Sequence, residues 1–404
     1  MQNSDSSTSS GSGSVFMTML LCFLIVTLDG FDTIAITFVA PILAKDWGIS
    51  PAAMVPTFLA TSVGAVVGYM ACGPLALRFG ARTMALASVV VFGLGSLATI
   101  FAGDITSLTV LRFVTALGLG GALPIAIAKA ADLMPGPKSA TAAMIIATGI
   151  SAGGVLAGIA GGPLMAHFGW KGVFIVGGIL PLLLLPWIAS AMRDGEVKSR
   201  QTDNGNAVSA LFGNGMGSAT VTLWLFAFLV FVIAYALISW MPTLALQMGL
   251  PPEKAPAVAA AFSMGGLIGN LLLIALSARV RTAMTLLVAA VIGLAGIAVF
   301  GLAGIPAGAI MPVVIVIGMG FIPCCVAQSA LAVTIYPAAL RTTGIGWAAA
   351  MGRIGSIAGP GVGGLVLALG WPPQQIVLVA AVPAVAAILL LLVFLKTPRV
   401  PVAA

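Results

Sequence analysis

Charge and histidine are scarce in this sequence of 404 residues. Only 7% of the residues are charged, and there is a single histidine, His167. A soluble domain carries about 25% charged residues, so the composition excludes a soluble enzyme. One histidine supplies too few ligands for a His-based metal site, and the chain contains no Walker A, HExxH or nucleophile-elbow motif. We expect no catalysis, no cofactor and no bound metal.

Cysteines are few and lie in the wrong places for a disulfide or zinc framework. Cys22, Cys72, Cys324 and Cys325 all sit inside apolar stretches, which indicates small buried packing residues. The 17 basic residues are scattered singly between apolar runs, so the formal charge of +7 predicts no nucleic-acid partner.

Apolar residues dominate the sequence, at 60% of the chain. Hydrophobic runs broken by Pro, Gly and charge predict an all-α polytopic membrane protein with twelve transmembrane helices and the lipid bilayer as its surroundings. The approximate predicted spans are 15–40, 53–76, 83–102, 107–131, 139–165, 172–192, 220–246, 256–277, 283–304, 308–333, 342–368 and 374–395.

The longest polar stretch divides these spans into six and six. The Ser- and Gly-rich start of the chain has too few apolar side chains to fold. The predicted segments are a disordered cytoplasmic tail at 1–14, an N-terminal bundle at 15–192, a cytoplasmic linker at 193–219, a C-terminal bundle at 220–396 and a cytoplasmic tail at 397–404.

The two halves resemble each other. Gly118-Leu119-Gly120 recurs as Gly318-Met319-Gly320, and Gly169-Trp170 recurs as Gly370-Trp371. An offset of about 200 residues is what a duplicated six-helix unit produces, and such repeats are typical of secondary transporters. The sequence therefore predicts two pseudo-symmetric six-helix bundles.

The distribution of Lys and Arg predicts the orientation. With a cytoplasmic N-terminus, eleven basic residues fall inside and three, Lys45, Lys171 and Lys254, fall outside. The inside residues are Arg78, Arg82, Lys138, Arg193, Lys198, Arg200, Arg279, Arg281, Arg341, Lys396 and Arg399.

Two acids lie three residues apart in the first span. Asp29 and Asp32 are expected on one helix face, toward a cavity or the bundle interior. A charge at bilayer depth is costly, so such residues are functional candidates by default. One of the pair is expected to bind and release a proton. The alternative is a structural pair that caps a neighbouring helix or meets an arginine.

Three basic residues lie within or at the edge of spans: Arg112, Lys129 and Arg353. Arg353 stands between Gly352 and Gly355, which we interpret as leaving room for its side chain. A buried guanidinium needs an anion, so Arg353 either binds a substrate carboxylate or pairs with one of the two acids. Arg112 precedes glycines that permit close helix contact, and its alternative role is packing and snorkelling near the outer interface.

Lys129 and Asp132 lie one turn apart, and we interpret them as a simple interfacial ion pair. His167 is interpreted as an interfacial residue. The uncharged candidates for a cavity lining are Tyr235, Trp240, Asn270, Gln328, Ser329 and Trp347, although Trp and Tyr in spans also serve as interface anchors.

Two motifs resemble those of the major facilitator superfamily, and in detail those of its aromatic acid:proton symporter family. The first is Leu28-Asp29-Gly30-Phe31-Asp32 followed by Ala40-Pro41. The second is Tyr336-Pro337, Arg341, Thr343-Gly344, Gly346-Trp347, Gly352-Arg353-Ile354-Gly355 and Gly359-Pro360, with Gln328 upstream. Arg112 with Gly118-Leu119-Gly120-Gly121 and Pro124 is similar to the fourth helix of the superfamily.

One loop departs from the family pattern. The family usually has an acid in a Gly-x-Leu-Ala-Asp-Arg-x-Gly run, and this chain has Leu77 there, followed by Arg78, Gly80 and Arg82. That acid helps to latch the inner gate in the family. The resemblance therefore implies a gate formed by Arg78, Gly80, Arg82 and Arg341 that is weaker or built differently here.

The resemblance implies import of a small aromatic carboxylate, of the benzoate, hydroxybenzoate or protocatechuate type, driven by the proton gradient. It implies a monomer in a bacterial inner membrane with alternating access and both termini cytoplasmic. We assign proton coupling to Asp29, Asp32 and Arg112, and the substrate-binding residues we predict are Arg353, Gln328, Trp347, Tyr235 and Asn270. Two alternatives remain: a transporter or exporter of another organic anion, and a transport-deficient sensor of the acid.

Overall fold

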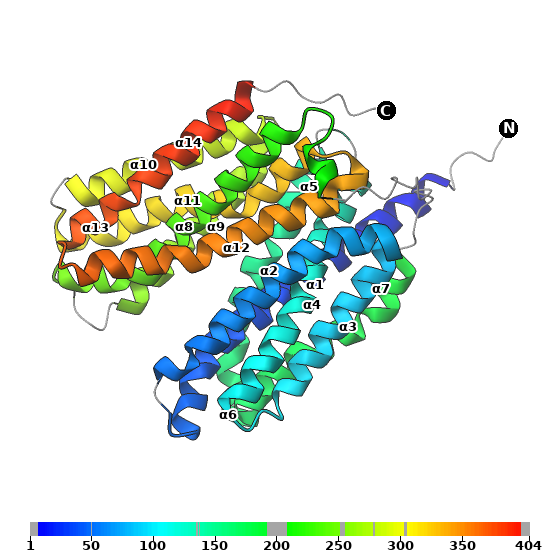
Figure 1. Ribbon diagram of the computed structural model, residues 1–404, viewed down its shortest axis with the longest axis horizontal. Coiled ribbons are helices and arrows are strands. Elements are labelled where there is room, and N and C mark those ends of the chain that lie inside the picture. The colour runs from blue at the N-terminus through cyan, green and yellow to red at the C-terminus, as the bar shows by residue number, and fades with distance from the viewer. Residues whose placement is uncertain are drawn as a thin grey trace. The chain divides into compact units, whose positions relative to one another are not determined.

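The computed structural model is built of helices and has no strand in the residues that it describes, which are 7–49, 51–134, 136, 138–191, 208–250, 255–277, 279–302 and 305–396 (Figure 1). The chain divides into two compact units: unit 1 is Met1–Leu211 with Ala338–Trp347, and unit 2 is Phe212–Pro337 with Ala348–Ala404. The predicted all-α polytopic fold is confirmed.

The described residues of unit 1 form seven α-helices and the first residues of α12. α2 packs along α4, α1 along α6, and α3 along both α4 and α6. The elements of this unit are α1 (Ser7–Asp46), η1 (Pro51–Met54), α2 (Val55–Phe79), α3 (Ala81–Thr99), α4 (Ile105–Leu133), α5 (Lys138–Ala147), α6 (Gly149–Leu183) and α7 (Leu185–Ala191), and the short η2 (Ser209–Phe212) stands at its boundary.

In unit 2, α11 packs along α9 and α10, and α14 packs along α8 and α10. Its elements are α8 (Gly217–Gln247), α9 (Ala255–Ser277), α10 (Thr282–Leu302), η4 (Ala307–Ala309), α11 (Ile310–Ile335), the larger part of α12 (Ala338–Ala368), α13 (Pro373–Val379) and α14 (Ala381–Lys396).

Eleven helical segments of the described chain are long and apolar enough to cross a membrane. The remaining predicted span, 342–368, corresponds to α12, where Arg341, Arg353 and several glycines stand in place of larger apolar residues. The predicted break after residue 165 appears at Gly169, whose positive φ of 64° interrupts α6. A glycine tolerates this conformation because it has no Cβ.

The chain ends and the linker differ in part from expectation. α1 begins at Ser7, so residues 7–14 are helical although the sequence predicts a disordered tail at 1–14. Extending an existing helix adds one hydrogen bond per residue and needs no new nucleus, which outweighs the weak helix propensity of Ser and Gly. Residues 1–6, residue 192, residues 193–207 of the predicted linker and the tail at 397–404 lie outside the described residues.

Glycines bring the helices of unit 1 into close contact, as predicted for α4. A Cβ at Gly118 would collide with the main chain of Phe92 and Ser88 on α3, and one at Gly120 would collide with the main chain of Ala65 on α2. α4 therefore packs closely between α2 and α3, and most of its residues are buried.

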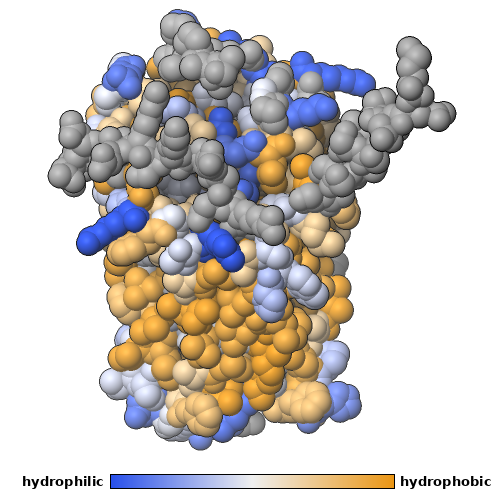
Figure 2. All heavy atoms as spheres, turned by 90° about the vertical axis from the view of Figure 1, so that its right-hand side faces the viewer, coloured by the Kyte–Doolittle hydropathy of each residue, from blue (hydrophilic) through white to orange (hydrophobic). Residues whose placement is uncertain are grey.

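Many large apolar side chains lie on the surface, among them Ile159, Leu271 and Leu302. One face of the molecule shows a broad belt of apolar side chains with hydrophilic ones at either end (Figure 2). A soluble protein seldom exposes a contiguous apolar surface of this kind, whereas lipid tails cover it at no cost. The chain is a multi-pass membrane protein.

Candidate functional site

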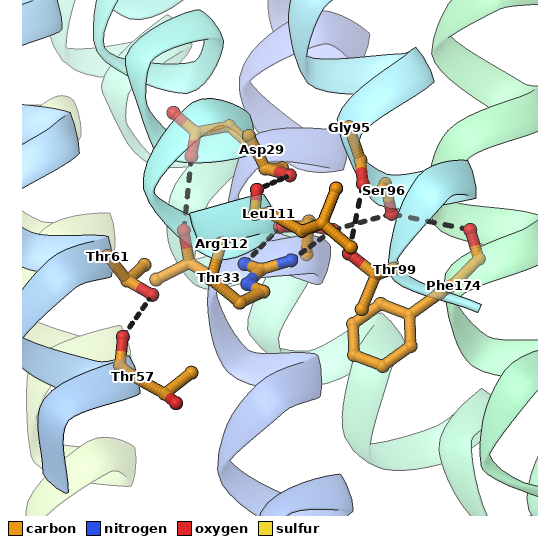
Figure 3. Close-up of polar contacts among 12 residues, drawn as sticks. Asp29, Thr33, Thr57, Thr61, Gly95, Ser96, Thr99, Leu111, Arg112 and Phe174 are labelled. Carbon is orange, nitrogen blue, oxygen red and sulfur yellow. Dashed lines mark hydrogen bonds and ion pairs between the residues drawn. The ribbon is translucent and has the colours of Figure 1, made fainter. Parts of the chain in front are cut away.

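The two acids of α1 are buried in the interior of unit 1. Asp29 is 2% exposed and Asp32 is 1% exposed, and their spacing places them one helical turn apart. The hydroxyl of Thr33 donates a hydrogen bond to Oδ1 of Asp29 at 3.2 Å (Figure 3). Both carboxylates therefore lie away from lipid, as the sequence predicts.

Small residues hold α1 against α6 beside these acids. A Cβ at Gly30 would collide with the carbonyl of Ile150, and a Cβ at Gly153 would collide with the carbonyl of Thr27. The main chains of the two helices therefore touch at this level, and α1 has little freedom to turn its acids away.

Asp32 forms a two-bond ion pair with Arg112 of α4. Nη2 of Arg112 lies 2.6 Å from Oδ2 of Asp32, and Nη1 lies 3.2 Å from Oδ1. Neither side chain is exposed at all. A buried charge without its partner is strongly destabilising, so each of these residues holds the other in position.

The structure corrects one interpretation of Arg112. The sequence left open a packing and snorkelling role near the outer interface, but the guanidinium is fully buried and paired. It also lies over the ring of Phe174 on α6, 5.6 Å from the ring centroid, a cation–π geometry. Arg112 is also the arginine that meets Asp32, a role that the sequence offered to Arg353.

Ser96 of α3 completes the surroundings of Asp32, and sequence reasoning did not single it out. Its hydroxyl lies 2.8 Å from Oδ1 of Asp32 and 3.3 Å from the carbonyl oxygen of Phe174 (Figure 3). A serine inside an apolar helix is a weak signal. The sequence signal that could have found it is the spacing of Ser88, Ser96 and Thr99, which recur near the helical period. In the structure all three are buried.

At the C-terminal end of α4, Asp132 pairs with Arg341, the first arginine of α12. The sequence predicts Lys129 as the partner, but the charge of Lys129 acts on Asp132 more weakly than that of Arg341. Arg341 has the better geometry because the start of α12 packs on α2, where a Cβ at Gly73 would collide with Thr343.

The other predicted gating residues lie at the junction of α2 and α3. Arg78 is exposed and stands over the ring of Phe79, with 5.2 Å between Cζ and the ring centroid. Gly80 joins the two helices with a positive φ of 89°, and Arg82 is half-buried in the first turn of α3. Leu77, at the position of the missing acid, is 42% exposed.

Four of the five predicted substrate residues lie in unit 2. Tyr235 of α8 stacks on Phe231, with ring centroids 5.8 Å apart and planes within 10° of parallel. Asn270 of α9 is 1% exposed and Gln328 of α11 is 4% exposed. Both amide atoms of Asn270 and Oε1 of Gln328 make no hydrogen bond within the described part of the chain.

Buried amide groups without a partner are costly. These two side chains are therefore able to accept a polar ligand or water at little further desolvation cost.

Arg353 is half-buried on α12 in unit 2. A Cβ at Gly352 would lie 3.0 Å from the ring of Phe231, and one at Gly355 would collide with the carbonyl of Phe228. The flanking glycines therefore make room for α8. Trp347, the fifth predicted residue, belongs to the part of α12 that is assigned to unit 1.

Other polar and aromatic residues of unit 2 have structural roles. Nε1 of Trp240 donates to the carbonyl of Pro360 at 2.8 Å. The hydroxyl of Tyr336 donates to Thr220 at 3.0 Å, and burial raises the pKa of Tyr336 to about 12, so the phenol stays neutral. The family motif residue Tyr336 therefore ties the end of α11 to α8.

A cavity of about 240 Å³ lies in unit 2 between α8, α12, α13 and α14. Apolar side chains and glycines line it, including Trp240, Val362 and Val382, and no predicted substrate residue does so. It therefore lacks a group that could bind a carboxylate. Within the described residues no three His, Cys, Asp or Glu side chains gather into a possible metal site.

Comparison with known proteins shows the family. Residues 22–360 match the Major Facilitator Superfamily. The chain belongs to this superfamily. Among its solved members, the proton:xylose symporter XylE bound to 6-bromo-6-deoxy-D-glucose has the same fold, with a TM-score of 0.77, 16% identity, and coverage of 96% of this chain and 97% of the other.

Curated relatives in the superfamily transport aromatic acids. The 4-hydroxybenzoate transporter PcaK of Pseudomonas putida is 33% identical, with coverage of 91% of this chain and 89% of the relative. The gallate transporter of Pseudomonas putida is 32% identical, with coverage of 93% of this chain and 91% of the relative. The 3-(3-hydroxy-phenyl)propionate transporter of Escherichia coli (strain K12) is 34% identical, with coverage of 90% of this chain and 89% of the relative. The predicted resemblance to aromatic acid transporters is thereby confirmed.

Proposed function

We propose that this protein imports a small aromatic carboxylate together with a proton. The observation that carries the proposal is the ion pair between Asp32 and Arg112, which is completely buried in a membrane-spanning bundle. Intramembrane acids of this kind mark ion pathways and proton relays. The names of the relatives support an aromatic acid as the substrate, and the symporter neighbour supports the coupling.

The pair provides a physical reason for coupling. A proton on Asp32 removes the negative charge that Arg112 faces, and the guanidinium must then find another anion. Asp29, one turn away on the same helix face, is such an anion. Proton binding therefore reorganises the contacts between α1 and α4.

Substrate binding is assigned to unit 2. Arg353 binds the carboxylate, since a guanidinium offers two parallel donors to it. Asn270 and Gln328 provide buried amide groups for ring hydroxyls, and the stacked Phe231 and Tyr235 provide an aromatic wall. One proton moving with one monocarboxylate transfers no net charge.

The pair formed by Arg341 and Asp132 is the inner latch in this proposal, in place of one that uses an acid at Leu77. It joins the start of α12 to the end of α4. Because the side chain of Asp132 is 41% exposed, solvent weakens this pair, which suits a contact that has to break in each transport cycle. The protein is proposed to work as a monomer in a bacterial inner membrane with both termini cytoplasmic.

Uptake of labelled aromatic acids into proteoliposomes tests the proposal. We expect one or more acids to accumulate when an inward proton gradient is imposed, and an uncoupler to abolish the accumulation. In the Asp32→Asn variant, accumulation should disappear while membrane insertion is retained. Uphill uptake by Asp32→Asn would reject Asp32 as the proton site, and binding without uptake would favour a sensor.

A companion variant tests the substrate site. Arg353→Lys keeps the positive charge but loses the planar fork, so we expect KM for the acid to rise about tenfold or more, which corresponds to the loss of one charged hydrogen bond. An unchanged KM would remove Arg353 from the binding site.

A further inference from the structure

Ser96 has two acceptors for one hydrogen. Its hydroxyl oxygen lies 2.8 Å from Oδ1 of Asp32 on α1 and 3.3 Å from the carbonyl of Phe174 on α6. A serine hydroxyl has a single O–H, which rotates freely to the better acceptor. The better acceptor is an ionised carboxylate, because a hydrogen bond to a charged group is about twice as strong as a neutral one.

The carbonyl of Phe174 becomes the better acceptor once Asp32 has bound a proton. The serine O–H then has a second place to go, and no buried hydroxyl is left without a partner. An unmade hydrogen bond in the interior costs free energy, so the second acceptor lowers the cost of discharging Asp32.

Phe174 contacts Arg112 directly and is connected to Asp32 through Ser96. Its carbonyl faces Ser96, and its ring lies under the guanidinium of Arg112. Near this point α3 and α6 are in main-chain contact, because a Cβ at Gly178 would lie 2.6 Å from the carbonyl of Gly93. Ser96 therefore stands where α1, α3, α4 and α6 converge, which Figure 3 shows.

The groups that face Asp32 from each packed helix are few. α4 contributes Arg112, and α1 contributes Asp29 one turn away. α3 contributes Ser96, and α6 contributes Phe174 and Gly177. The other charged or titratable side chains of α3 and α6 are Arg82, in the first turn of α3, and His167 and Lys171, which are exposed.

We propose that Ser96 is a positioning residue for the transported proton: its hydroxyl sets the pH at which Asp32 exchanges that proton by switching between Asp32 and the carbonyl of Phe174. The proposal rests on the proposed proton symport and adds a residue to it. Ser96→Ala removes a donor to the ionised carboxylate and leaves the protonated form almost unaffected. Asp32 should then hold its proton to higher pH.

Infrared difference spectroscopy of the purified protein tests this without any substrate. The titrating carboxyl band of Asp32 is identified by its loss in Asp32→Asn. In Ser96→Ala we expect the midpoint of this band to rise by about one pH unit. Ser96→Thr, which keeps a hydroxyl, should stay close to the original midpoint.

Ser88→Ala is the matched control, because Ser88 is a buried serine of the same helix whose hydroxyl makes no hydrogen bond in the described residues. The midpoint of the Asp32 carboxyl band should not move in Ser88→Ala.

Proteoliposome uptake measured against pH separates this proposal from the symport proposal. With Ser96→Ala, the alkaline limb of proton-driven uptake should move by the same interval as the infrared band. Failure of symport would appear as uncoupler-insensitive uptake by the original protein, whatever the serine does. Equal midpoints in Ser96→Ala and the original protein, an equal shift in Ser88→Ala, or the absence of a titrating Asp32 band would each overturn the role of Ser96.

Discussion

Arg341 at the start of α12 forms an ion pair with Asp132 at the end of α4, within unit 1. The two residues are 209 positions apart in the sequence. This pair joins α4 to α12, and the later residues of α12 belong to unit 2. Its arginine is part of the family motif, but its acid lies on α4 and not at the position of Leu77 in the loop between α2 and α3.

Charge exchange tests this latch. Asp132→Asn or Arg341→Gln should each lower the initial rate of uptake, by no more than about tenfold because the pair is partly exposed to solvent. The double reversal Asp132→Arg with Arg341→Asp should recover part of the rate, since it restores opposite charges at the same place. A double reversal that is worse than both single variants would show that the pair is not the latch.

The buried pair of Asp32 and Arg112 makes a prediction about stability. Arg112→Leu leaves the carboxylate buried without its cation and should cost about 3–5 kcal/mol. The double variant Asp32→Asn with Arg112→Leu removes both charges and should unfold at a higher temperature than Arg112→Leu alone. Thermal unfolding in detergent measures both, and additive losses in the double variant would contradict direct pairing.

The contact of α1 with α6 makes a prediction about packing. Gly153→Ala places a methyl group against the carbonyl of Thr27 and should destabilise the protein by about 1–3 kcal/mol. Gly103→Ala is the control, because nothing lies within 4 Å of the added Cβ and the backbone there needs no glycine. Equal unfolding temperatures for the two variants would mean that the close approach is absent.

The loop before α4 makes a prediction about pH. Asp104 caps α4 by accepting a hydrogen bond from the main-chain N–H of Ser107 at 2.7 Å, and this bond lowers the pKa of Asp104 below its ordinary value of 3.8. The stabilisation by the ionised cap is therefore present at neutral pH and is lost as the pH falls below about 4 toward the folded-state pKa.

Asp104→Asn keeps a capping side chain that does not titrate. Its unfolding temperature should change less than that of the original protein between pH 6 and pH 3. A difference of the same size in both proteins would show that the cap does not contribute.

The sequence predicts what depends on composition and local spacing. The helical spans follow from the length of the apolar runs, and the burial of Asp29 and Asp32 on one face follows from a three-residue spacing in an apolar helix. The motifs around them also indicate the family before any coordinates are known. Each of these signals is contained in one short stretch of chain.

Partners that are distant in sequence could not be predicted in this way. Asp32 and Arg112 are 80 residues apart, and one sequence does not tell which buried arginine meets which acid. For the same reason Lys129, one turn from Asp132, looked like its partner, although Asp132 forms an ion pair with Arg341, which the packing of α12 on α2 brings to it. Ser96 gave almost no signal, because its importance depends on where α3 lies.

Simultaneous measurement of proton and acid movement tests the central claim most directly. Proteoliposomes that contain a pH-sensitive dye are given an aromatic acid from the panel on the outside. No pH gradient is imposed, and the membrane potential is clamped. The account predicts that the lumen acidifies as the acid enters, beyond the acidification caused by passive diffusion into protein-free vesicles, and that Asp32→Asn abolishes this protein-dependent proton flux. Acid entry without proton entry, or protons that move in the opposite direction, would contradict proton symport.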